Sequence, residues 1–311
     1  MTSSDGPAEA SPLRVAIAII TYKRPELLGK LLDSLASQHV AEADIALRIV
    51  IVDNDPKGSA RSTVDHARRQ ETWSITYEVE PVPGIPAARQ RSVELCPDDD
   101  AVVFVDDDEF CPPGWLSALL TCWTRTGADV ITGPVHGTVP PGAPSWNYHS
   151  DIHSSRGKHK TGESLNKAYT NNTLVSRRVL DTVTPAFDDR FRFTGSSDLH
   201  FFQRVHRAGF TIRWCAEAEV HEHVPRERTT LQWLAKRAFR SGAGDSISRR
   251  LIRPGFLSVA EVLAFASARL GSGLLLIVGG LLPRQQRWRI KGIRRVFSAI
   301  GSFAGLFGLN Y

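Results

Sequence analysis

Four consecutive acidic residues, Asp106-Asp107-Asp108-Glu109, follow directly after the apolar run 101–105. A divalent cation prefers oxygen ligands, and a cation that is also bound to a diphosphate takes only one or two carboxylates from the protein. Alternate carboxylates just past a strand can reach both the cation and the diphosphate-bearing ligand. The run therefore predicts a Mg²⁺ or Mn²⁺ site, and the alternative is a solvated acidic turn.

Two histidines could add a ligand to this cation. His221 and His223 alternate in the sequence, so on a strand their side chains lie on one face. We prefer His223 as the ligand, and the alternative is an exposed histidine pair at a strand end.

An arginine further along could contact a diphosphate. Trp233, Arg237 and Arg240 recur at helical spacing within the predicted amphipathic helix 229–241. A guanidinium is planar and permanently charged, which suits paired phosphate oxygens. Arg237 is our candidate, and the alternative is a solvated basic face with Trp233 packed in the core.

The elements that must position these residues alternate between strand and helix. Apolar β-branched runs predict buried strands, leucines at helical spacing predict a helix, and 73–79 reads as an edge strand. This rhythm predicts an α/β fold with a mostly parallel sheet flanked by helices, which binds ligands at the carboxyl ends of its strands. The predicted strands in this half are 14–20, 47–52, 73–79 and 101–105, and the predicted helices are 27–35 and 86–95.

The pattern changes after about residue 110. The expected order is a helix at 115–123, a strand at 129–135, a long Gly- and Pro-rich loop at 136–168, and a strand near 170–175. A helix near 198–208 and a strand at 211–220 follow. Four scattered cysteines without a CxxC spacing argue against a zinc site or a disulfide framework and fit a reducing cytosol.

Charge is distributed unevenly along the 311 residues. Residues 225–311 hold 15 Lys and Arg against 3 Asp and Glu, a net charge of +12, whereas residues 1–224 carry a net −7. Such a basic segment could bind nucleic acid, a polyanion or an anionic membrane. Because it is also rich in Leu, Ile, Phe and Gly, we expect a membrane surface and no nucleic acid.

The same segment is a poor candidate for a complete membrane span. Between Arg269 and Arg284 lie 14 uncharged residues, which as a helix cover about 20 Å of the roughly 30 Å of a bilayer core. The residues that follow mix Arg and Lys with Trp, Ile and Phe, as interfacial helices do. The alternatives are an oligomerisation surface or a helical pair packed on the catalytic domain.

Several segments together resemble glycosyltransferase family 2, an inverting family with the Rossmann-like GT-A fold. They are AIITYKRPELL, VIVDND, PGIPAARQRSVE, VVFVDDDE and TGSSDLHFFQRV, in this order and spacing, within roughly residues 14–240. The DDDE variant and HEHVPRERTTLQWLAKRAFRSG look most like bacterial polysaccharide-assembly members of the succinoglycan type. A flexible leader (1–13), a catalytic domain (14–240, with a nucleotide-binding half to about 110 and an acceptor half from about 111) and a membrane-associating helical tail (241–311) are expected.

The resemblance implies roles in binding the donor nucleotide. Thr21 and Tyr22 would wrap the nucleobase, Asp53 would accept a hydrogen bond from uracil, and Arg89 would line the same pocket. Glu26 is a further candidate, with stabilisation of a first helical turn as the alternative. The family's DxD motif falls on two of the four acids, and the third acid between them would contact the nucleotide sugar. These residues are Asp106 and Asp108 for the metal, with Asp108 the direct ligand, and Asp107 for the donor.

The resemblance also identifies a catalytic base, Asp198, at the predicted start of a helix. An inverting transfer needs one carboxylate to deprotonate the acceptor hydroxyl as it attacks the anomeric carbon. Many members of the family have Glu-Asp where this chain has Ser197-Asp198, which puts the acceptor contacts in doubt and leaves the base. The alternative is that Asp198 only caps the helix.

The expected reaction is transfer from a nucleotide sugar, UDP-linked, to a saccharide or polyprenyl-linked saccharide at the cytoplasmic face of the cell membrane. A sugar nucleotidyltransferase is one alternative, although the turn TYKRPE lacks the Gly-rich phosphate loop expected of that class. A non-catalytic, membrane-associated sugar-nucleotide binder is the other. The sugar, the acceptor linkage and the oligomeric state are not predicted.

Overall fold

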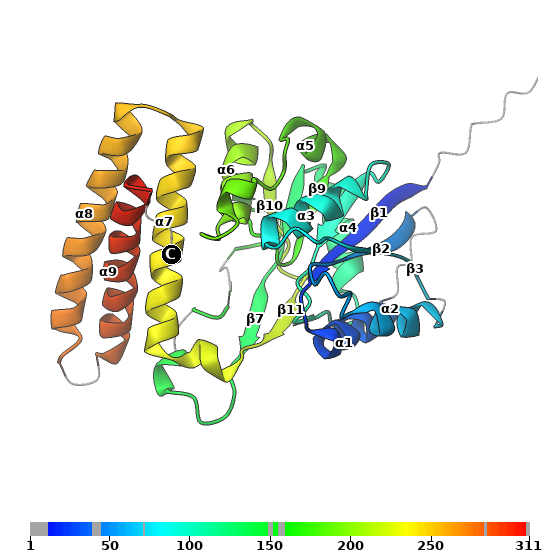
Figure 1. Cartoon of the computed structure of the whole chain (residues 1–311), viewed down its shortest axis with the longest axis horizontal. Coiled ribbons are helices and arrows are strands. Elements are labelled where there is room, and N and C mark those ends of the chain that lie inside the picture. Colours follow the sequence, from blue (N-terminus) through cyan, green and yellow to red (C-terminus); the bar gives the residue numbers. More distant parts are fainter. Residues whose placement is uncertain are drawn as a thin grey trace, which may run out of the picture.

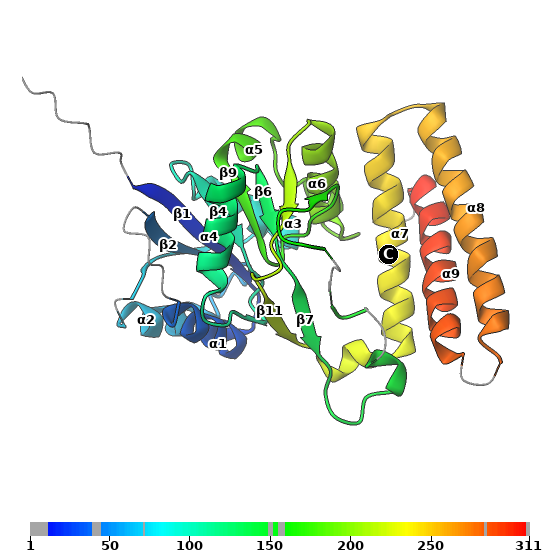
Figure 2. The same ribbon diagram turned by 180° about the vertical axis from the view of Figure 1, so that it is seen from behind.

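A computed structural model describes residues 12–38, 45–70, 72–148, 152–154, 159–282 and 285–308. Most of the predicted leader (residues 1–11) and parts of the predicted long loop (149–151 and 155–158) lie outside the described residues. The chain forms a layered α/β domain beside three long helices (Figures 1 and 2).

The main sheet has eight strands among the described residues, in the order β3-β2-β1-β4-β9-β6-β10-β8. Strands β3, β2, β1 and β4 run parallel, and β9 runs antiparallel to both β4 and β6. The predicted mostly parallel sheet is therefore a mixed sheet whose parallel half holds the acidic turn. The strands are β1 (Leu13–Thr21), β2 (Ile45–Asp53), β3 (Ser74–Val79), β4 (Ala101–Phe104), β6 (Val130–Thr132), β8 (Ser164–Leu165), β9 (Thr173–Ser176) and β10 (Ile212–Trp214).

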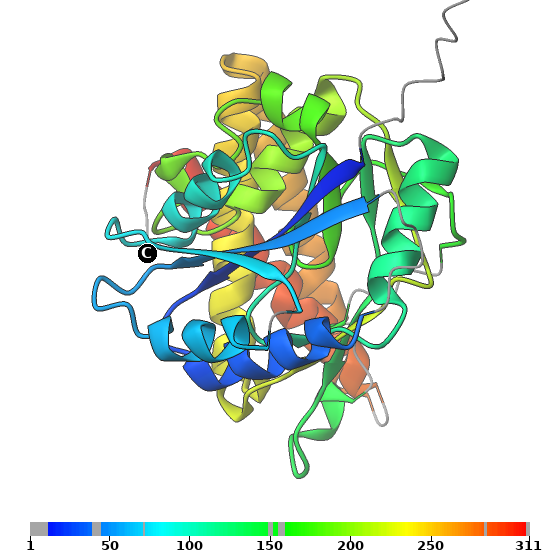
Figure 3. The ribbon, with the colours of Figure 1, turned by 90° about the vertical axis from the view of Figure 1, so that its right-hand side faces the viewer.

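Helices cover both faces of this sheet because its strands are apolar on both sides. Ile17 and Ile19 of β1 pack with α1, α2 and α4, whereas Ala16 and Ala18 belong to the cluster with α3, α5 and α6. Figure 3 shows α1 and α2 below strands β1 and β2. The helices are α1 (Pro25–Ala36), α2 (Arg61–Arg68), α3 (Ile85–Glu94), α4 (Trp115–Thr126), α5 (Arg177–Thr182) and α6 (Ser197–Arg207).

A second sheet, in the order β5-β11-β7, corrects two of the predicted strands. The expected strand 129–135 divides into β6 and β7 (Val135–Thr138), and 211–220 divides into β10 and β11 (Val220–His223). The two segments stay parallel neighbours, but their register changes from Val130↔Ile212 to Val135↔Val220, which interrupts the ladder. At this interruption a side chain on Gly133 would overlap the carbonyl of Ala218. Beyond it, β11 lies beside β5 (Glu109–Phe110), at the end of the acidic turn.

Asn172 links the two segments at this interruption of the ladder. Its buried side chain donates from Nδ2 to the carbonyls of Pro134 (2.9 Å) and Ala218 (2.6 Å), and its Oδ1 accepts from Trp115 Nε1 (2.8 Å). The residue has φ +66°, a left-handed conformation that asparagine tolerates better than most residues. One side chain thus fixes the point where both segments leave the main sheet.

The C-terminal helices are α7 (Leu231–Ile252), α8 (Phe256–Gly279) and α9 (Gln286–Leu306), with short 3₁₀ turns at Ser145–Asn147, Asp189–Phe191 and Arg226–Thr229 elsewhere. Helix α9 lies between α7 and α8 (Figures 1 and 2). Glycines permit the close approach, since a side chain at Gly292 would lie 2.6 Å from the carbonyl of Gly273. The predicted domain boundary at residue 240 falls inside the continuous helix α7.

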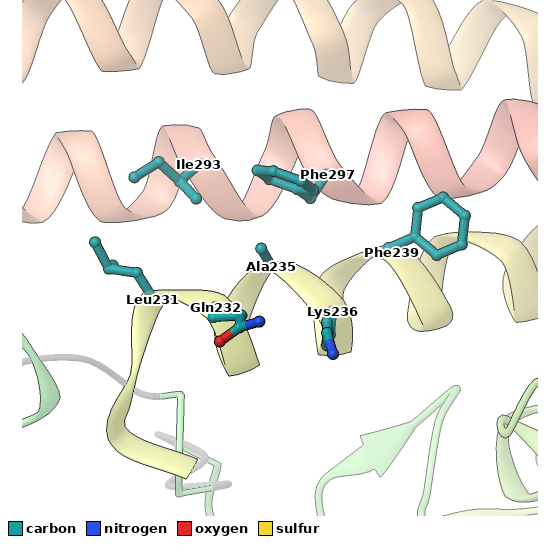
Figure 4. Close-up of a pocket in the computed structure, with 7 residues that line it drawn as sticks. All are labelled: Leu231, Gln232, Ala235, Lys236, Phe239, Ile293 and Phe297. Atoms are coloured by element: carbon teal, nitrogen blue, oxygen red, sulfur yellow. The ribbon is translucent and has the colours of Figure 1, made fainter. Parts of the chain in front are cut away.

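An apolar groove of about 500 Å³ opens between α7 and α9 (Figure 4). Leu231, Ala235 and Phe239 of α7 and Ile293 and Phe297 of α9 line it. Helix α8 is long and apolar enough to cross a membrane by length and composition, and only 17% of its 18-residue apolar window is buried. The C-terminal helices thus leave much apolar surface uncovered.

We expect Asn172→Ala to lower the free energy of unfolding by about 3 kcal/mol, because it removes the partner of the Trp115 N–H, the Asn172 donor to the buried Ala218 carbonyl and one of two donors to the Pro134 carbonyl. Chemical denaturation measures the change. Asn171→Ala, at the half-buried neighbouring position, serves as the matched control and should cost far less. Equal losses in both variants would contradict the role of the Asn172 side chain.

Candidate active site

The acidic run forms a tight turn between β4 and β5. The backbone N–H of Asp106 donates to Glu109 Oε2 (2.9 Å), and the N–H of Glu109 donates to the carbonyl of Asp106 (3.2 Å). Glu109 is buried, and its Oε1 has no hydrogen-bond partner among the described residues. Burial and the charge of Asp106 raise the pKa of Glu109 well above its ordinary value. Glu109 therefore stabilises the turn through a buried side-chain hydrogen bond to its first residue.

Asp107, the middle acid, faces the protein interior. It accepts a hydrogen bond from Thr21 Oγ1 (2.7 Å) and pairs with Arg24 Nη1 (3.2 Å). Burial raises its pKa to about 6, against the lowering effect of the Thr21 hydroxyl. These contacts tie the turn to the end of β1, and they occupy the carboxylate that was expected to contact the donor.

The outer acids, Asp106 and Asp108, pair with arginines from three other segments. Asp106 Oδ1 lies 3.0 Å from Arg89 Nη2 of α3. Asp108 Oδ2 lies 3.1 Å from Arg24 Nη1 and 3.5 Å from Arg228 Nη2. Burial, together with the charge of Asp106, raises the pKa of Asp108. Two carboxylates held close at a strand end form a region of high negative charge surrounded by cationic partners.

This donor set fits a divalent cation that a diphosphate helps to bind. Among the described residues, no group of three or more His, Cys, Asp or Glu has a geometry for holding a metal. Such a cation would take Asp106 and Asp108 as hard oxygen ligands and complete its shell with ligand phosphates and water. The raised pKa of Asp108 and the unpaired Oε1 of Glu109 mark excess negative charge in the turn that a cation would relieve.

Glu222, on β11, is a site residue that the sequence analysis missed. Its carboxylate lies 2.5 Å from Arg228 Nη1. Burial, followed by the charges of Asp108 and Asp106, raises its pKa to about 7, against the effect of Arg228. The signal was present in the sequence, because Glu222 stands between the two histidines and alternation gives it the opposite face of the strand.

The two histidines occupy that other face of β11. The ring of His221 packs against the ring of His136, with 5.3 Å between centroids, and His223 is exposed at the strand end. Glu222 is therefore the β11 side chain directed toward the carboxylates. His223 as a metal ligand stays a prediction without a contact to support it.

At the end of β1, Tyr22 is the exposed member of the predicted nucleobase segment. Tyr22 is 52% exposed, whereas Thr21 is buried. The Thr21 hydroxyl donates to Asp107, and the Thr21 carbonyl accepts from the N–H of Asn54 (2.8 Å). Thr21 therefore links strand ends, and Tyr22 offers a ring to a ligand. Arg89 is nearly buried beside Asp106, where it can line the same edge.

Asp53 corrects another expectation. The residue has no exposed surface, and its Oδ1 accepts from the N–H of Asp55 (2.9 Å). Its Oδ2 accepts from the N–H of Ala60 (2.8 Å) and from the hydroxyl of Tyr77 (2.9 Å). With both oxygens occupied and no accessible surface, Asp53 orders the loop after β2 and does not reach a nucleobase in this structure.

Glu26 lies exposed in the first turn of α1, the position where a carboxylate stabilises the positive end of a helix. The structure thus gives Glu26 the setting of its alternative, structural role.

Asp198 occupies the first turn of α6, as predicted. The helix N-cap is Ser196, with φ +71° and no side-chain capping bond. Asp198 is half-buried, and its Oδ1 accepts from the N–H of Leu199 (2.8 Å). Asp198 is therefore not the N-cap, and within the described part of the chain its second oxygen accepts no hydrogen bond.

Arg237 connects the acidic turn electrostatically with Asp198. Its pKa is lowered, chiefly by desolvation within the fold, while the charges of Glu222 and Asp198 oppose the lowering. Its guanidinium stacks 5.1 Å from the ring centroid of Trp233, and Nη1 lies 3.5 Å from the carbonyl of Ile152. Surrounding atoms crowd the guanidinium, but the residue as a whole is exposed, so Arg237 can still receive an anion.

Comparisons with known proteins identify the family of the chain. Residues 16–184 match the family model described as glycosyl transferase family 2. The succinoglycan biosynthesis protein ExoM of Rhizobium meliloti (strain 1021) is 36% identical over 316 residues, which cover 96% of this chain and 94% of that protein.

Two solved structures share the fold. Mannosyltransferase PcManGT from Pyrobaculum calidifontis, in complex with GDP-Man and Mn²⁺, has a TM-score of 0.63 at 18% identity, covering 98% of this chain and 91% of that chain. S. aureus TarS 1–349 in complex with UDP-GlcNAc has a TM-score of 0.53 at 13% identity, covering 96% and 93%. These likenesses confirm the predicted GT-A fold.

We expect Glu222→Gln to make the protein more stable, by an amount that grows with pH. The folded-state pKa of Glu222 is raised to about 7 from an ordinary 4.5, so the native protein binds this proton more tightly than the unfolded chain. Wild-type stability from this group is therefore greatest below pH 4.5 and is lost as the pH rises to about 7. Chemical denaturation in EDTA at pH 5, 6, 7 and 8 measures the difference.

The exposed Glu227→Gln serves as the matched control and should show no such trend. A stability difference for Glu222→Gln that stays constant from pH 5 to pH 8 would contradict the raised pKa.

Proposed function

The chain belongs to glycosyltransferase family 2 and is a glycosyltransferase, and we propose that it is an inverting, metal-dependent enzyme that uses a UDP-linked sugar. The proposed acceptor is a saccharide or a polyprenyl-linked saccharide in the assembly of a cell-surface polysaccharide or glycolipid. The similarity to a succinoglycan biosynthesis protein over nearly the full length of both chains supports the polysaccharide setting.

One observation carries the proposed mechanism. Arg237 lies within electrostatic reach of Glu222, which neighbours the acidic turn, and of Asp198, at the start of α6. A diphosphate beside Arg237 would have the acidic turn and its cation on one side and Asp198 on the other. This is the arrangement that an in-line displacement at the anomeric carbon requires.

The donor half of the site would hold the nucleotide diphosphate. Tyr22 offers its ring to the base, and Arg89 lines the edge beside Asp106. Asp106 and Asp108 would hold Mn²⁺ or Mg²⁺, which when bound neutralises charge on the diphosphate. Two structural neighbours were solved with nucleotide sugars, GDP-Man with Mn²⁺ in one and UDP-GlcNAc in the other, which supports a nucleotide-sugar donor and a divalent cation. The choice of UDP rests on the family resemblance alone, because Asp53 no longer argues for uracil.

Asp198 would act as the base for the acceptor. The acceptor hydroxyl oxygen attacks the anomeric carbon and forms the new C–O bond, while its proton moves to the free oxygen of Asp198. The bond from the anomeric carbon to the diphosphate oxygen breaks, and its electron pair leaves on the diphosphate. Arg237 stabilises the charge that develops on that oxygen. Because attack and departure take place on opposite faces, the configuration inverts.

We further propose that α8 and α9 bind to the cytoplasmic surface of the cell membrane. Leu257, Leu275 and Val278 of α8 are between 66% and 83% exposed. Helix α9 also has exposed cationic residues, and Arg269 of α8 donates to Ser298 of α9 (2.9 Å). A helix pair with this composition suits the bilayer interface, where apolar side chains insert and cations meet anionic headgroups. The exposed cations are Arg287, Arg289, Lys291 and Arg294.

The first test is a panel of UDP-, dTDP- and GDP-sugars with octyl β-glucoside as acceptor probe, with and without Mn²⁺ or Mg²⁺. We expect one donor to turn over only with metal, and Asp198→Asn to lower kcat by about 10²- to 10⁴-fold while donor binding persists. Asp108→Ala should abolish the metal dependence together with the activity. Asp65→Asn, on an exposed pair with Arg68, is the control. Metal-independent turnover, or an active Asp198→Asn enzyme, would refute the mechanism.

We expect Leu275→Glu to weaken binding to vesicles of phosphatidylcholine and phosphatidylglycerol by about tenfold, since a leucine side chain then no longer enters the apolar layer. Co-sedimentation measures the effect. Leu13→Glu, on an exposed leucine at the start of β1, is the control and should bind as the wild type does. Equal binding of both variants would argue against α8 as the membrane face.

A further inference from the structure

The turn before Asp198 has a conformation that its own sequence does not favour. Gly195 has φ +73° and Ser196 has φ +71°, both in the left-handed region. Glycine enters this region freely, but an L-serine is strained there, and an N-cap serine ordinarily has extended backbone with its hydroxyl on the helix N–H groups. Ser196 makes no such capping bond. The conformation must therefore be imposed by a neighbouring element.

That neighbour is α7. A Cβ atom on Gly244 would lie 2.5 Å from Ser196 Cβ and would also overlap its Oγ, so the serine occupies the space that a side chain at position 244 would need. A Cβ on Gly195 would lie 3.0 Å from Arg240 Nη2 of the same helix. Two consecutive residues of the turn thus rest on α7.

Polar contacts fix the rest of α6 against α7. His200 Nδ1 lies 2.8 Å from Ser248 Oγ, and Ser248 Oγ donates to Gln203 Oε1 at 2.5 Å. Gln203 Nε2 in turn donates to Asp245 Oδ1 (3.2 Å). His200 and Ser248 are buried, so sliding α6 along α7 would strand polar groups without partners.

Helix α7 is held from its other side by α9. A side chain at Gly242 would overlap the carbonyl of Ser298, and Ser302 Oγ donates to the carbonyl of Gly242 (3.2 Å). Gly242 and Gly244 therefore place the backbone of α7 in close contact with α9 on one side and with the turn before Asp198 on the other.

We propose that Gly244 and Ser196 are positioning residues, through which the C-terminal helices set the place and direction of the Asp198 carboxylate. The proposal rests on the proposed role of Asp198 as the base. The absence of a side chain at position 244 lets the turn approach α7 and adopt its left-handed conformation, which starts α6 where Asp198 faces the acceptor. A displacement of about 1 Å at a reacting group is enough to lower a rate by up to about 100-fold.

The test is Gly244→Ala in the full-length protein. The added methyl group must push the turn away, because Ser196 Cβ cannot leave by a side-chain rotation. We expect kcat to fall by about 10- to 100-fold, with the KM for the nucleotide sugar and its calorimetric binding unchanged. The assay uses the donor that the panel identifies, octyl β-glucoside as the acceptor probe and nucleotide release as the readout. Gly271→Ala is the matched control, because a Cβ on this glycine of α8 would have nothing within 4 Å.

A second variant separates positioning from misfolding. Ser196→Gly removes the atoms that the alanine would meet and supplies a residue suited to positive φ, leaving Gly195 O at 3.3 Å as the nearest remaining atom. The double variant Ser196→Gly/Gly244→Ala should therefore recover most of the lost kcat. Wild-type kcat in Gly244→Ala would overturn the proposal, and so would a double variant as slow as Gly244→Ala alone.

These outcomes are distinct from those that test the base itself. If Asp198→Asn transfers sugar at the wild-type rate, the proposed function of Asp198 fails whatever Gly244→Ala does. If Asp198→Asn is inactive and Gly244→Ala is fully active, the base stands and only the positioning role is overturned.

Discussion

The arrangement of the acidic turn depends on one buried carboxylate. Asp107 holds the end of β1 through Thr21 and pairs with Arg24, at the cost of a pKa raised by burial. The three side chains differ in exposure, at 35% for Asp106 against 8% for Asp107 and 9% for Asp108. The anchored turn therefore leaves Asp106 partly at the surface and holds Asp108 beside Arg24 and Arg228.

The site is built from charges that are poorly satisfied in the absence of ligand. Glu109, Asp108 and Glu222 all have raised pKa values, while Arg237 has a lowered one. Each departure means that burial removes more stabilisation from the charged form than the partners return. Groups in this condition, gathered at one edge of the fold, are typical of a binding site. Under the proposed function, a cation and a diphosphate would supply the missing partners.

The sequence predicted the elements well where one property decided the outcome. Runs of β-branched residues located β1, β2 and β4, and Asp198 was placed correctly at the start of a helix because the apolar period begins just after it. The sequence-based prediction failed where contacts between distant segments determine the structure. The division of the strands at Gly133 depends on the carbonyl of Ala218, more than 80 residues away, which no local pattern reveals.

The site residues divide in the same way. The position of Asp106 and Asp108 at the end of β4 follows from the apolar run before them, which a sequence can express. The burial of Asp53 does not, because its three donors come from a loop and a neighbouring strand that must first be in place. Glu222 was missed for a different reason. The two histidines beside it suggested a metal site, whereas the side chain that faces the carboxylates is the one between them.

The continuity of α7 has a consequence for how such enzymes can be recombined. Its first turns carry Arg237, its middle supports the turn before Asp198, and its last turns lead into the apolar α8. A chimaera joined at residue 240, where the sequence suggests a seam, would mix the active-site residues of one enzyme with the scaffold of another. Exchanging the apolar helix α8 between relatives without exchanging the helix that carries Arg237 requires a junction beyond Ile252, and even there α9 must come from the same parent as α7.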